Sequence, residues 1–437
     1  MRPRSMVLLV AVPLLTVVAG VVGWLLDWRL GVDSAVYRAG ALTLLHGEPL
    51  YEANTLGPEP WWALLPFTYP PTAALLFVPL AVLPIQVAWG VIAAVSILAM
   101  ALVIRVAIGA LPRPAGDLSR WASPARATLI FSLVFLGLEP VWRTLFLGQI
   151  NLILMALVML DVLVISARGS RSEDHSGAKR HRLGGVLVGV ATAVKLTPAV
   201  FIAHLLFTGR WRDALRAVGT FCGLQALMFA LVPADAARFW THTLFDTGRI
   251  GPIHWAGNQS LNGLLNRITD LAPWASTVAL GIGVLLAGPA IWLMLRFHRR
   301  GQSLAALLVT AFYVLLASPV SWSHHWVWAV PLIVLLVSRL PQTTPATAWK
   351  HWLAAGGVIA VFLSCVLLVL PNGRNIELHW QFWQNVLGNA YILVPLVLIA
   401  ALAARHLLRR ARARRGTAGP PEIENQHDEH VDATPAR

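Results

Sequence analysis

The chain has 437 residues, of which 57% are hydrophobic and only 12% are charged, whereas a soluble globular domain carries about 25% charged residues. This composition excludes a soluble enzyme and predicts an integral membrane protein. The apolar runs are about 20 residues long and do not alternate, so they predict spanning helices rather than the strands of an outer-membrane barrel. The net charge of +14 does not indicate nucleic-acid binding, because the basic residues form short clusters between apolar segments, as in cytoplasmic loops.

The first apolar run extends from Met6 to Leu26 and is long enough to cross a bilayer, which favours an uncleaved helix over a signal peptide. Together with the later segments it predicts an all-α polytopic protein with about twelve transmembrane helices. Segment 70–84 is short and interrupted by prolines, so we expect an interfacial or re-entrant helix there. The later spans are expected at roughly 85–108, 125–138, 149–167, 183–194, 196–208, 215–233, 272–297, 303–317, 325–340, 351–370 and 386–408.

Basic residues indicate the orientation, because they accumulate in cytoplasmic loops. If the N-terminus is inside and 70–84 does not cross, most basic residues lie in the cytoplasm; counting 70–84 as a span would place most of them outside. We therefore expect both termini in the cytoplasm and two long outer segments, 27–84 with interfacial helices and 234–271. A single transmembrane domain is expected over 1–415, followed by a polar, disordered cytoplasmic tail, 416–437.

The first outer segment contains Asp33, just before a short amphipathic pattern that starts at Ser34. Asp33 either caps that helix or is a functional carboxylate at the bilayer surface beneath a cavity, with Tyr37 one turn further along the same face. Tyr69 follows in the sequence FTYPP, in which two prolines impose an extended backbone and a rigid helix start.

A dense polar cluster lies between two expected spans and consists of Glu139, Arg143, Gln149 and Asn151. Polar and ionisable groups at membrane depth are costly, which makes these residues functional candidates. A structural salt bridge between Glu139 and Arg143, four residues apart, is the alternative.

Lys195 lies between two short apolar segments that Pro198 interrupts. A broken helix exposes backbone groups that bind ions, and an ammonium group at such a break suits a phosphate. A lysine that extends its side chain to the bilayer surface is the alternative.

The second outer segment is rich in glycine and polar side chains, including Asn258 and Gln259, and is typical of a binding loop. Further on, His324 and His325 lie among tryptophans in the sequence SWSHHWVW, at the start of an apolar span. A histidine pair can bind a metal, but no other His, Cys or carboxylate set has ligand spacing, so we expect no metal site. The tryptophans are also typical of the aromatic belt of a membrane protein.

All these polar motifs lie on the outer face under the orientation that the basic residues predict. The cytoplasmic segments contain no P-loop or GxGxxG motif, so a cytoplasmic nucleotide is not the energy source. Chemistry at the outer leaflet, where nucleotide sugars are absent, requires a substrate delivered on a lipid.

Six motifs carry a family resemblance over about residues 30–335: VDSAVYRAGA, LPFTYPPTAALLFVPLAVLP, EPVWRTLFLGQINLILM, GVLVGVATAVKLTPAV, TGRIGPIHWAGNQS and SPVSWSHHWVWAVPL. In this order they resemble the actinobacterial polyprenol-phosphate-mannose-dependent mannosyltransferases of glycosyltransferase family 87. The chain is similar to the α-(1→2)-mannosyltransferases that elongate phosphatidylinositol mannosides and decorate lipomannan.

The resemblance implies a GT-C fold in the plasma membrane and an inverting transferase whose active site lies on the outer face. Asp33 would be the general base on the acceptor hydroxyl, and inversion of a β-mannosyl polyprenyl phosphate donor would give an α-linkage. The acceptor would be a mannolipid, either a phosphatidylinositol mannoside or lipomannan. The resemblance assigns the donor phosphate and sugars to Arg143, Lys195, His324, His325, Tyr69, Gln149, Asn151, Asn258 and Gln259.

No cofactor is expected besides the lipid-linked sugar, and the first outer segment lacks the DxD pair of metal-dependent relatives. Two alternatives stay open. An arabinofuranosyl- or glucosyltransferase could use the same scaffold, although the related arabinofuranosyltransferases share YPP and lack the SHHW element. A lipid or solute transporter would explain the broken segment at Lys195, but the chain has no internal repeat and its polar motifs gather on one face.

Overall fold

The computed structural model describes residues 3–52, 55–111, 123–167, 183–340 and 345–416. The regular structure of these residues is helical, apart from one isolated bridge between Asn258 and Trp322, so the expected all-α class is confirmed. The charge clusters within 112–122 and 168–182, which were expected in the cytoplasm, lie outside the described residues. So does the expected disordered tail, except for Gly416, which ends the last helix.

The described chain forms two units, residues 1–392 and 393–437. The longer helices of the first unit are α1 (Pro3–Leu25), α2 (Val32–His46), α5 (Ile85–Gly109), α12 (Trp211–Leu231), α15 (Ala275–Arg299), α16 (Ser303–Ala317) and α18 (Pro345–Leu363). The shorter α-helices are α3 (Pro71–Leu76), α4 (Val78–Ala81), α6 (Pro124–Phe135), α7 (Glu139–Leu147), α8 (Asn151–Leu160), α10 (Val186–Val194), α11 (Val200–Phe207), α13 (Pro233–Thr241), α14 (Leu261–Ile268), α17 (Ala329–Arg339), α19 (Val366–Val369) and α20 (Phe382–Gly388).

Single-turn helices of other types connect these elements: the π-helix η2 (Asp161–Ile165) and the 3₁₀-helices η3 (Thr197–Ala199), η4 (Thr243–Phe245), η5 (Thr247–Ile250), η6 (Ser323–Trp328) and η8 (Ile376–His379). The second unit consists, within the described residues, of the greater part of α21 (Ala390–Gly416). The single domain expected over 1–415 stays a prediction.

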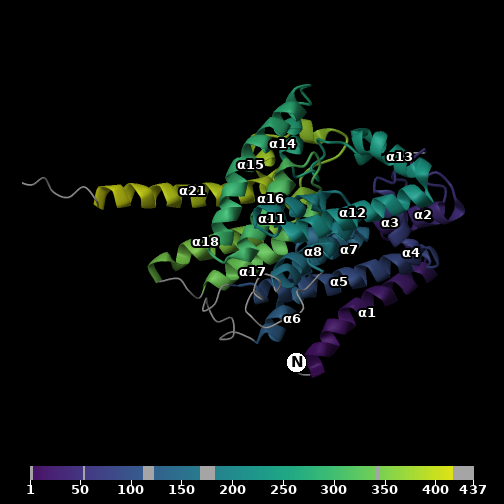
Figure 1. Ribbon diagram of the computed structural model, residues 1–437, viewed down its shortest axis with the longest axis horizontal. Helices are drawn as coiled ribbons and strands as arrows, with labels where there is room; N and C mark the ends of the chain where they lie inside the picture. Colours follow the sequence, from purple (N-terminus) through teal and green to yellow (C-terminus); the bar gives the residue numbers. More distant parts are fainter. Residues whose placement is uncertain (1–2, 53–54, 112–122, 168–182, 341–344, 417–437) are drawn as a thin grey trace, which may run out of the picture. The chain divides into compact units, whose positions relative to one another are not determined.

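Helix α5 packs against α1, α6 and α8, and Figure 1 shows α1 and α5 side by side. These two helices approach most closely at Gly20 and Gly90, where a Cβ on either glycine would collide with the backbone of the opposite helix. Small residues permit such close packing between helices in a membrane. The Thr16 hydroxyl adds a hydrogen bond across the contact to the Gly90 carbonyl, at 3.2 Å.

Within the described residues, four segments are long and apolar enough to cross a membrane: α5, α12, α15 and Trp352–Val369. The number rises to six if two bent helix pairs each form one span. The two segments expected on either side of Lys195 are separate short helices, α10 and α11. Helix α6, in the expected span 125–138, is followed by α7 at an angle of 74°. The structure and composition therefore give a multi-pass helical membrane protein, and the count of twelve spans stays a prediction.

Segment 70–84 forms two helices of six and four residues, α3 and α4. Pro71 and Pro79 lie in the first turns of these helices, where a missing N–H group breaks no intrahelical hydrogen bond. Helix α3 packs against α2, α10 and α12. This packing brings Tyr69, which directly precedes α3, to the same region as the N-terminal half of α2.

Candidate active site

Asp33 lies in the first turn of α2, which begins one residue earlier, at Val32. The N-cap is Gly31, in the left-handed conformation, and no side chain caps the helix. The interpretation of Asp33 as an N-cap is therefore wrong, because the helix starts two residues earlier than the amphipathic pattern suggested. Its carboxylate is half-buried and benefits from the partial positive charge of the helix N-terminus.

Two glycines bring the start of α2 against the end of α7. Gly31 precedes α2 and Gly148 ends α7, and both have positive φ, at 72° and 69°. A Cβ on either glycine would overlap the Ser34 hydroxyl. This close approach places Asp33 near Gln149, the residue directly after Gly148.

Three side chains next to Asp33 form a closed ring of hydrogen bonds. The Tyr37 hydroxyl donates to Gln149 Oε1 at 2.7 Å, Gln149 Nε2 donates to the Tyr69 hydroxyl at 3.1 Å, and the two hydroxyls are 3.0 Å apart. All three residues are buried. Residues from α2, from the segment before α3 and from the α7–α8 turn are thus fixed relative to one another.

Lys195 occupies the break that the sequence predicted. It ends α10 in an extended conformation, and the 3₁₀-turn η3 follows one residue later. Its Nζ atom donates to Asn151 Oδ1 at 3.2 Å and lies 3.3 Å from His325 Nε2. The ammonium group also lies 5.6 Å from the centre of the Tyr69 ring. Lys195 therefore contacts both the histidine pair and the hydrogen-bonded group of Tyr37, Tyr69 and Gln149.

The two histidines lie in η6, with their rings edge to face at 4.8 Å. The backbone of this turn is held by side chains of α7 and α8: the His324 carbonyl accepts from Asn151 Nδ2 at 3.0 Å and from Thr144 Oγ1 at 3.2 Å. Neither ring nitrogen of the buried His324 has a hydrogen-bond partner within the described residues. A buried imidazole without partners is costly, and this one has both its donor and its acceptor available to a ligand.

Burial dominates the electrostatics of this cluster. It raises the pKa of Asp33 to about 6, against the opposing effects of Lys195, Gln149 and Arg143. Burial lowers the pKa of Lys195 to about 8, against the charge of Asp33. Burial, together with the Lys195 charge, holds the pKa of both His324 and His325 well below the usual range. At neutral pH the cluster therefore contains a carboxylate, an ammonium ion and two neutral imidazoles.

Arg143 lies on α7 at the edge of the cluster and is partly exposed. One of its guanidinium nitrogens is 3.9 Å from Glu139 Oε1. The salt bridge between Glu139 and Arg143, which the sequence offered as an alternative, is therefore present as a long contact. The guanidinium carbon also lies 5.4 Å from the centre of the Trp255 ring. Both contacts leave part of the guanidinium free to meet an anion.

Asn258 and Gln259 are fully buried and bind the backbone rather than the cluster. Asn258 Oδ1 accepts a hydrogen bond from the Ser321 backbone N–H at 2.9 Å, and the Gln259 backbone N–H donates to the Ser321 carbonyl at 2.7 Å. The Gln259 side chain donates to the carbonyls of Ala256 and Gly388. The structure thus pairs these two residues with the backbone of the segment that leads into η6, and none of their hydrogen bonds within the described residues goes to the other predicted site residues.

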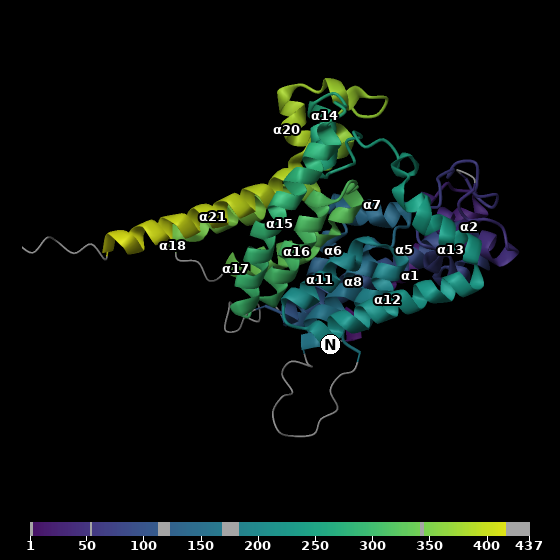
Figure 2. The ribbon, with the colours of Figure 1, turned by 45° about the horizontal axis from the view of Figure 1, so that its top comes forward.

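Two residues of this region were not predicted as site residues. Tyr37 was placed on the Asp33 face by helical spacing, but nothing in the sequence predicted its contact with Gln149. Arg267 is buried in α14 and donates to the carbonyls of Trp255 and Asn258 at 3.0 and 2.9 Å, and to Asn389 Oδ1 at 2.5 Å. Figure 2 shows α14 beside α20, and Asn389 is the C-cap of α20. No sequence spacing signals this contact, because its partners are far apart in the chain.

In the described part of the chain, no group of three His, Cys, Asp or Glu side chains is arranged to hold a metal ion. The cluster instead combines one carboxylate with two cations, two imidazoles and several hydroxyl and amide groups. Such a set can bind an anionic group and a polyhydroxylated ligand and can accept a proton. The fold and the site together define a helical membrane protein with an enzyme-like polar centre.

The profile of glycosyltransferase family 87 matches residues 67–319. The chain belongs to this family and is therefore a membrane glycosyltransferase. Asp33, His324 and His325 lie outside the residues that match the family profile. The curated relatives described next match a longer part of the chain.

The chain is 34% identical to the polyprenol-phosphate-mannose-dependent α-(1-2)-phosphatidylinositol mannoside mannosyltransferase of Mycobacterium tuberculosis (strain H37Rv), over 93% of this chain and 95% of the relative. It is 31% identical to the protein of the same name from Mycolicibacterium smegmatis, over 86% of each chain. It is 30% identical to the polyprenol-phosphate-mannose-dependent α-(1-2)-phosphatidylinositol pentamannoside mannosyltransferase of Mycobacterium tuberculosis (strain CDC 1551), over 88% of this chain and 84% of the relative. No solved structure matches the chain.

Proposed function

We propose that this protein transfers mannose from a polyprenyl phosphate mannose donor to a mannolipid acceptor at the outer face of the plasma membrane, forming an α-(1→2) linkage. The names of the relatives specify this donor and a phosphatidylinositol mannoside acceptor for those proteins. The proposal includes a GT-C fold of about twelve spans with both termini in the cytoplasm.

The observation that carries the proposal is the juxtaposition of Asp33 with Lys195 and the histidine turn. Asp33 and Lys195 are 162 positions apart in the sequence, yet the Lys195 ammonium group lies 5.6 Å from the ring of Tyr69, whose hydroxyl contacts Tyr37 and Gln149 beside Asp33. A carboxylate with a pKa near the working pH is suited to general-base catalysis. Cations next to it are suited to a phosphate leaving group.

The reaction is a single displacement with inversion. An acceptor hydroxyl attacks the anomeric carbon of the donor, and Asp33 takes the hydroxyl proton as the new C–O bond forms. The bond between the anomeric carbon and the phosphate oxygen breaks, and polyprenyl phosphate leaves with the electron pair. Arg143 and Lys195 neutralise the charge on the leaving phosphate, and the two neutral imidazoles donate hydrogen bonds to it.

The Gln149 amide binds Tyr37 and Tyr69, and the Asn151 amide binds Lys195. From these positions the two amides can orient the hydroxyl groups of the donor sugar. Tyr69 presents a hydroxyl and a ring face at the same place. Asn258 and Gln259 act in this proposal through the backbone before η6, because the Asn258 side-chain amide and the Gln259 Nε2 atom already bind backbone groups. Gln259 Oε1 is buried without a partner in the described residues. No cofactor other than the lipid-linked sugar is part of the proposal.

The test is transfer by purified protein in proteoliposomes supplied with polyprenyl phosphate carrying radiolabelled mannose and a phosphatidylinositol mannoside. The proposal predicts a longer, α-mannosidase-sensitive mannolipid together with free polyprenyl phosphate. Product from the arabinofuranosyl donor instead of the mannosyl donor would identify the arabinofuranosyltransferase alternative. Movement of the lipid across the bilayer without a new glycosidic bond would identify a transporter.

A further inference from the structure

We propose that Glu139 is a positioning residue of the transferase site, which fixes the His324 turn through Ser323 and orients Arg143 toward the donor phosphate. The inference rests on the proposed function, since it takes Arg143 and His324 as ligands of that phosphate. Glu139 is the first residue of α7 and is fully buried. A buried carboxylate is costly unless its oxygens are well bound.

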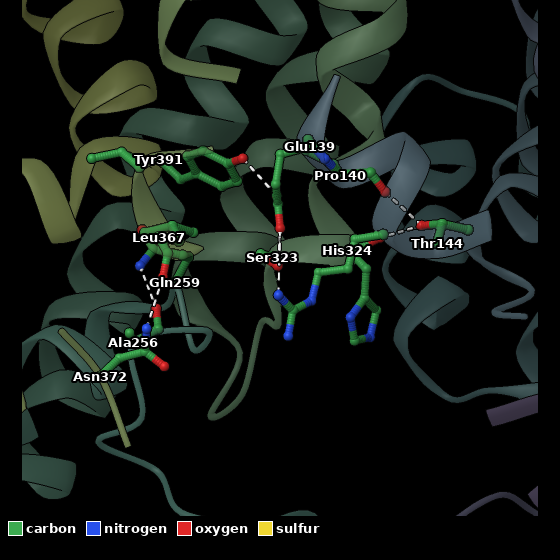
Figure 3. Close-up of polar contacts among 12 residues, drawn as sticks. Glu139, Pro140, Thr144, Ala256, Gln259, Ser323, His324, Leu367, Asn372 and Tyr391 are labelled. Carbon is green, nitrogen blue, oxygen red and sulfur yellow. Dashed lines mark hydrogen bonds and ion pairs between the residues drawn. The ribbon is translucent and has the colours of Figure 1, made fainter. Parts of the chain in front are cut away.

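Both carboxylate oxygens of Glu139 accept a short hydrogen bond. Ser323 Oγ donates to Oε1 at 2.8 Å, and the Tyr391 hydroxyl donates to Oε2 at 2.6 Å. Figure 3 shows the two hydroxyl groups pointing at the carboxylate from different elements, with the His324 ring directed away from it. The carboxylate therefore joins α7, η6 and the start of α21 at one point.

The first of these bonds bears on the histidines, because Ser323 directly precedes His324. The His324 carbonyl is separately bound by Thr144 of the same helix α7 and by Asn151. The turn is thus fixed on both sides of the His324 Cα, while its imidazole has no protein partner in the described residues. A ring that is fixed at its base and unpartnered at its nitrogens is prepared for a ligand.

The second effect bears on Arg143, one helical turn after Glu139. Its guanidinium lies between the Glu139 carboxylate, at 3.9 Å, and the face of Trp255, at 5.4 Å from the ring centre. Trp255 itself packs against Trp322, the residue before Ser323, with ring centres 5.3 Å apart. Glu139 and this tryptophan pair confine the guanidinium without using all its donors, so part of it stays free for phosphate.

The Tyr391 bond connects the site to the C-terminal end of the first unit, far beyond residue 319, where the match to the family profile ends. Tyr391 also packs its ring on Phe362 and Trp326, with ring centres 4.5 and 5.7 Å apart. The C-terminal segment up to residue 392 thereby influences the phosphate end of the site without touching it.

The experiment measures binding of polyprenyl phosphate to full-length protein in nanodiscs, together with donor KM and kcat. Glu139→Gln keeps the size of the side chain but leaves one acceptor oxygen and removes the charge beside Arg143. We expect it to weaken polyprenyl phosphate binding at least about 10-fold, which corresponds to about 1.4 kcal/mol. Ser323→Ala removes only the link to the histidine turn and should weaken binding in the same direction, which keeps the test open if Glu139→Gln does not fold.

A double-mutant cycle with Arg143→Gln separates positioning from general stability. If Glu139 acts partly through Arg143, its substitution weakens binding less in the Arg143→Gln background than in the wild-type background, because only the route through Ser323 is then left to lose. The matched control is Asp161→Asn, because Asp161 is also a fully buried helix carboxylate, bound by the amides of Gly185 and Val188 away from the site. This control should lower the melting temperature and leave polyprenyl phosphate affinity unchanged.

Wild-type affinity for Glu139→Gln and Ser323→Ala, or a full loss from Glu139→Gln in the Arg143→Gln background, would overturn the inference. The wild-type protein is measured against polyprenyl phosphate and unphosphorylated polyprenol first. If it does not distinguish the two lipids, the proposed function fails. If it distinguishes them and Glu139 has no effect, only the role of Glu139 fails.

Discussion

The ammonium group of Lys195 lies 3.3 Å from Nε2 of His325, and its second contact is Asn151 Oδ1 at 3.2 Å. An ammonium ion can only donate hydrogen bonds. His325 Nε2 is therefore the acceptor, and the ring is neutral with its proton on Nδ1. This pairing leaves His325 Nδ1–H and the third ammonium proton of Lys195 as donors for a ligand.

The pH dependence of turnover should be bell-shaped. Asp33 must be ionised to take a proton, and burial raises its pKa to about 6; Lys195 must be protonated, and burial lowers its pKa to about 8. We expect kcat/KM to fall below about pH 6 and above about pH 8. A constant kcat/KM across both values would contradict these roles.

Lys195→Met tests the coupling between the two charges. The Lys195 charge lowers the pKa of Asp33, so its removal should move the acidic limb of the residual activity to higher pH and eliminate the alkaline limb. We expect the rate at pH 7 to fall at least about 10-fold, since a cation opposite the leaving phosphate is lost. An acidic limb that stays in place or moves to lower pH would show that the two groups do not interact.

The hydrogen-bonded ring of Tyr37, Tyr69 and Gln149 gives a further prediction. Tyr69→Phe leaves the Tyr37 hydroxyl and the Gln149 amide each short of a partner, at a cost of about 1–3 kcal/mol. We expect turnover to fall about 10-fold or more while the protein remains folded. The matched control is Tyr313→Phe, which removes a hydrogen bond to Gly283 in the α15–α16 pair; equal losses from both variants would contradict a local role for Tyr69.

Arg267→Lys should destabilise the protein. The guanidinium binds three carbonyls and Asn389 from a buried position, and a lysine cannot reproduce this geometry. We expect a lower melting temperature, with a loss of about 2–4 kcal/mol on the basis of hydrogen bonds to charged groups. Arg105→Lys, at an exposed position of α5, is the control and should have no effect; a melting temperature unchanged in Arg267→Lys would contradict the structural role.

Much of the site was predictable because polar and ionisable residues are costly in apolar segments at membrane depth, which makes each of them a functional candidate. Asp33, Gln149, Asn151, Lys195 and the histidine pair were each identified from local sequence, whereas Tyr69 was assigned only by the family resemblance. The structure brings all of them together. Their convergence was predicted only as a shared face of the membrane, because spacing along the chain gives no distance between separate helices.

Other features could not be read from the sequence. The start of α2 was misjudged by two residues, since Gly31 rather than Asp33 precedes the helix. The polar, glycine-rich composition around Asn258 and Gln259 predicted a binding loop, and only the family resemblance assigned them to the sugars. A loop whose side chains bind neighbouring backbone has the same composition. The bond from Tyr391 to Glu139 joins residues 252 positions apart, and no local pattern marks either of them as the other's partner.

Asp33→Asn tests the central claim most directly. The substitution preserves size and removes the proton acceptor, and general-base catalysis contributes roughly 10²–10⁴-fold. Removal of a carboxylate whose pKa is raised by burial should not lower the melting temperature at pH 7, because the ionised form of such a group is unfavourable in the folded state above its pKa.

The measurement is transfer of radiolabelled mannose by Asp33→Asn and wild-type protein side by side in the same proteoliposomes. The account predicts that the variant binds polyprenyl phosphate and melts no earlier than wild type, yet forms at most about one hundredth of the elongated mannolipid. Mannolipid formation by Asp33→Asn at the wild-type rate would contradict it.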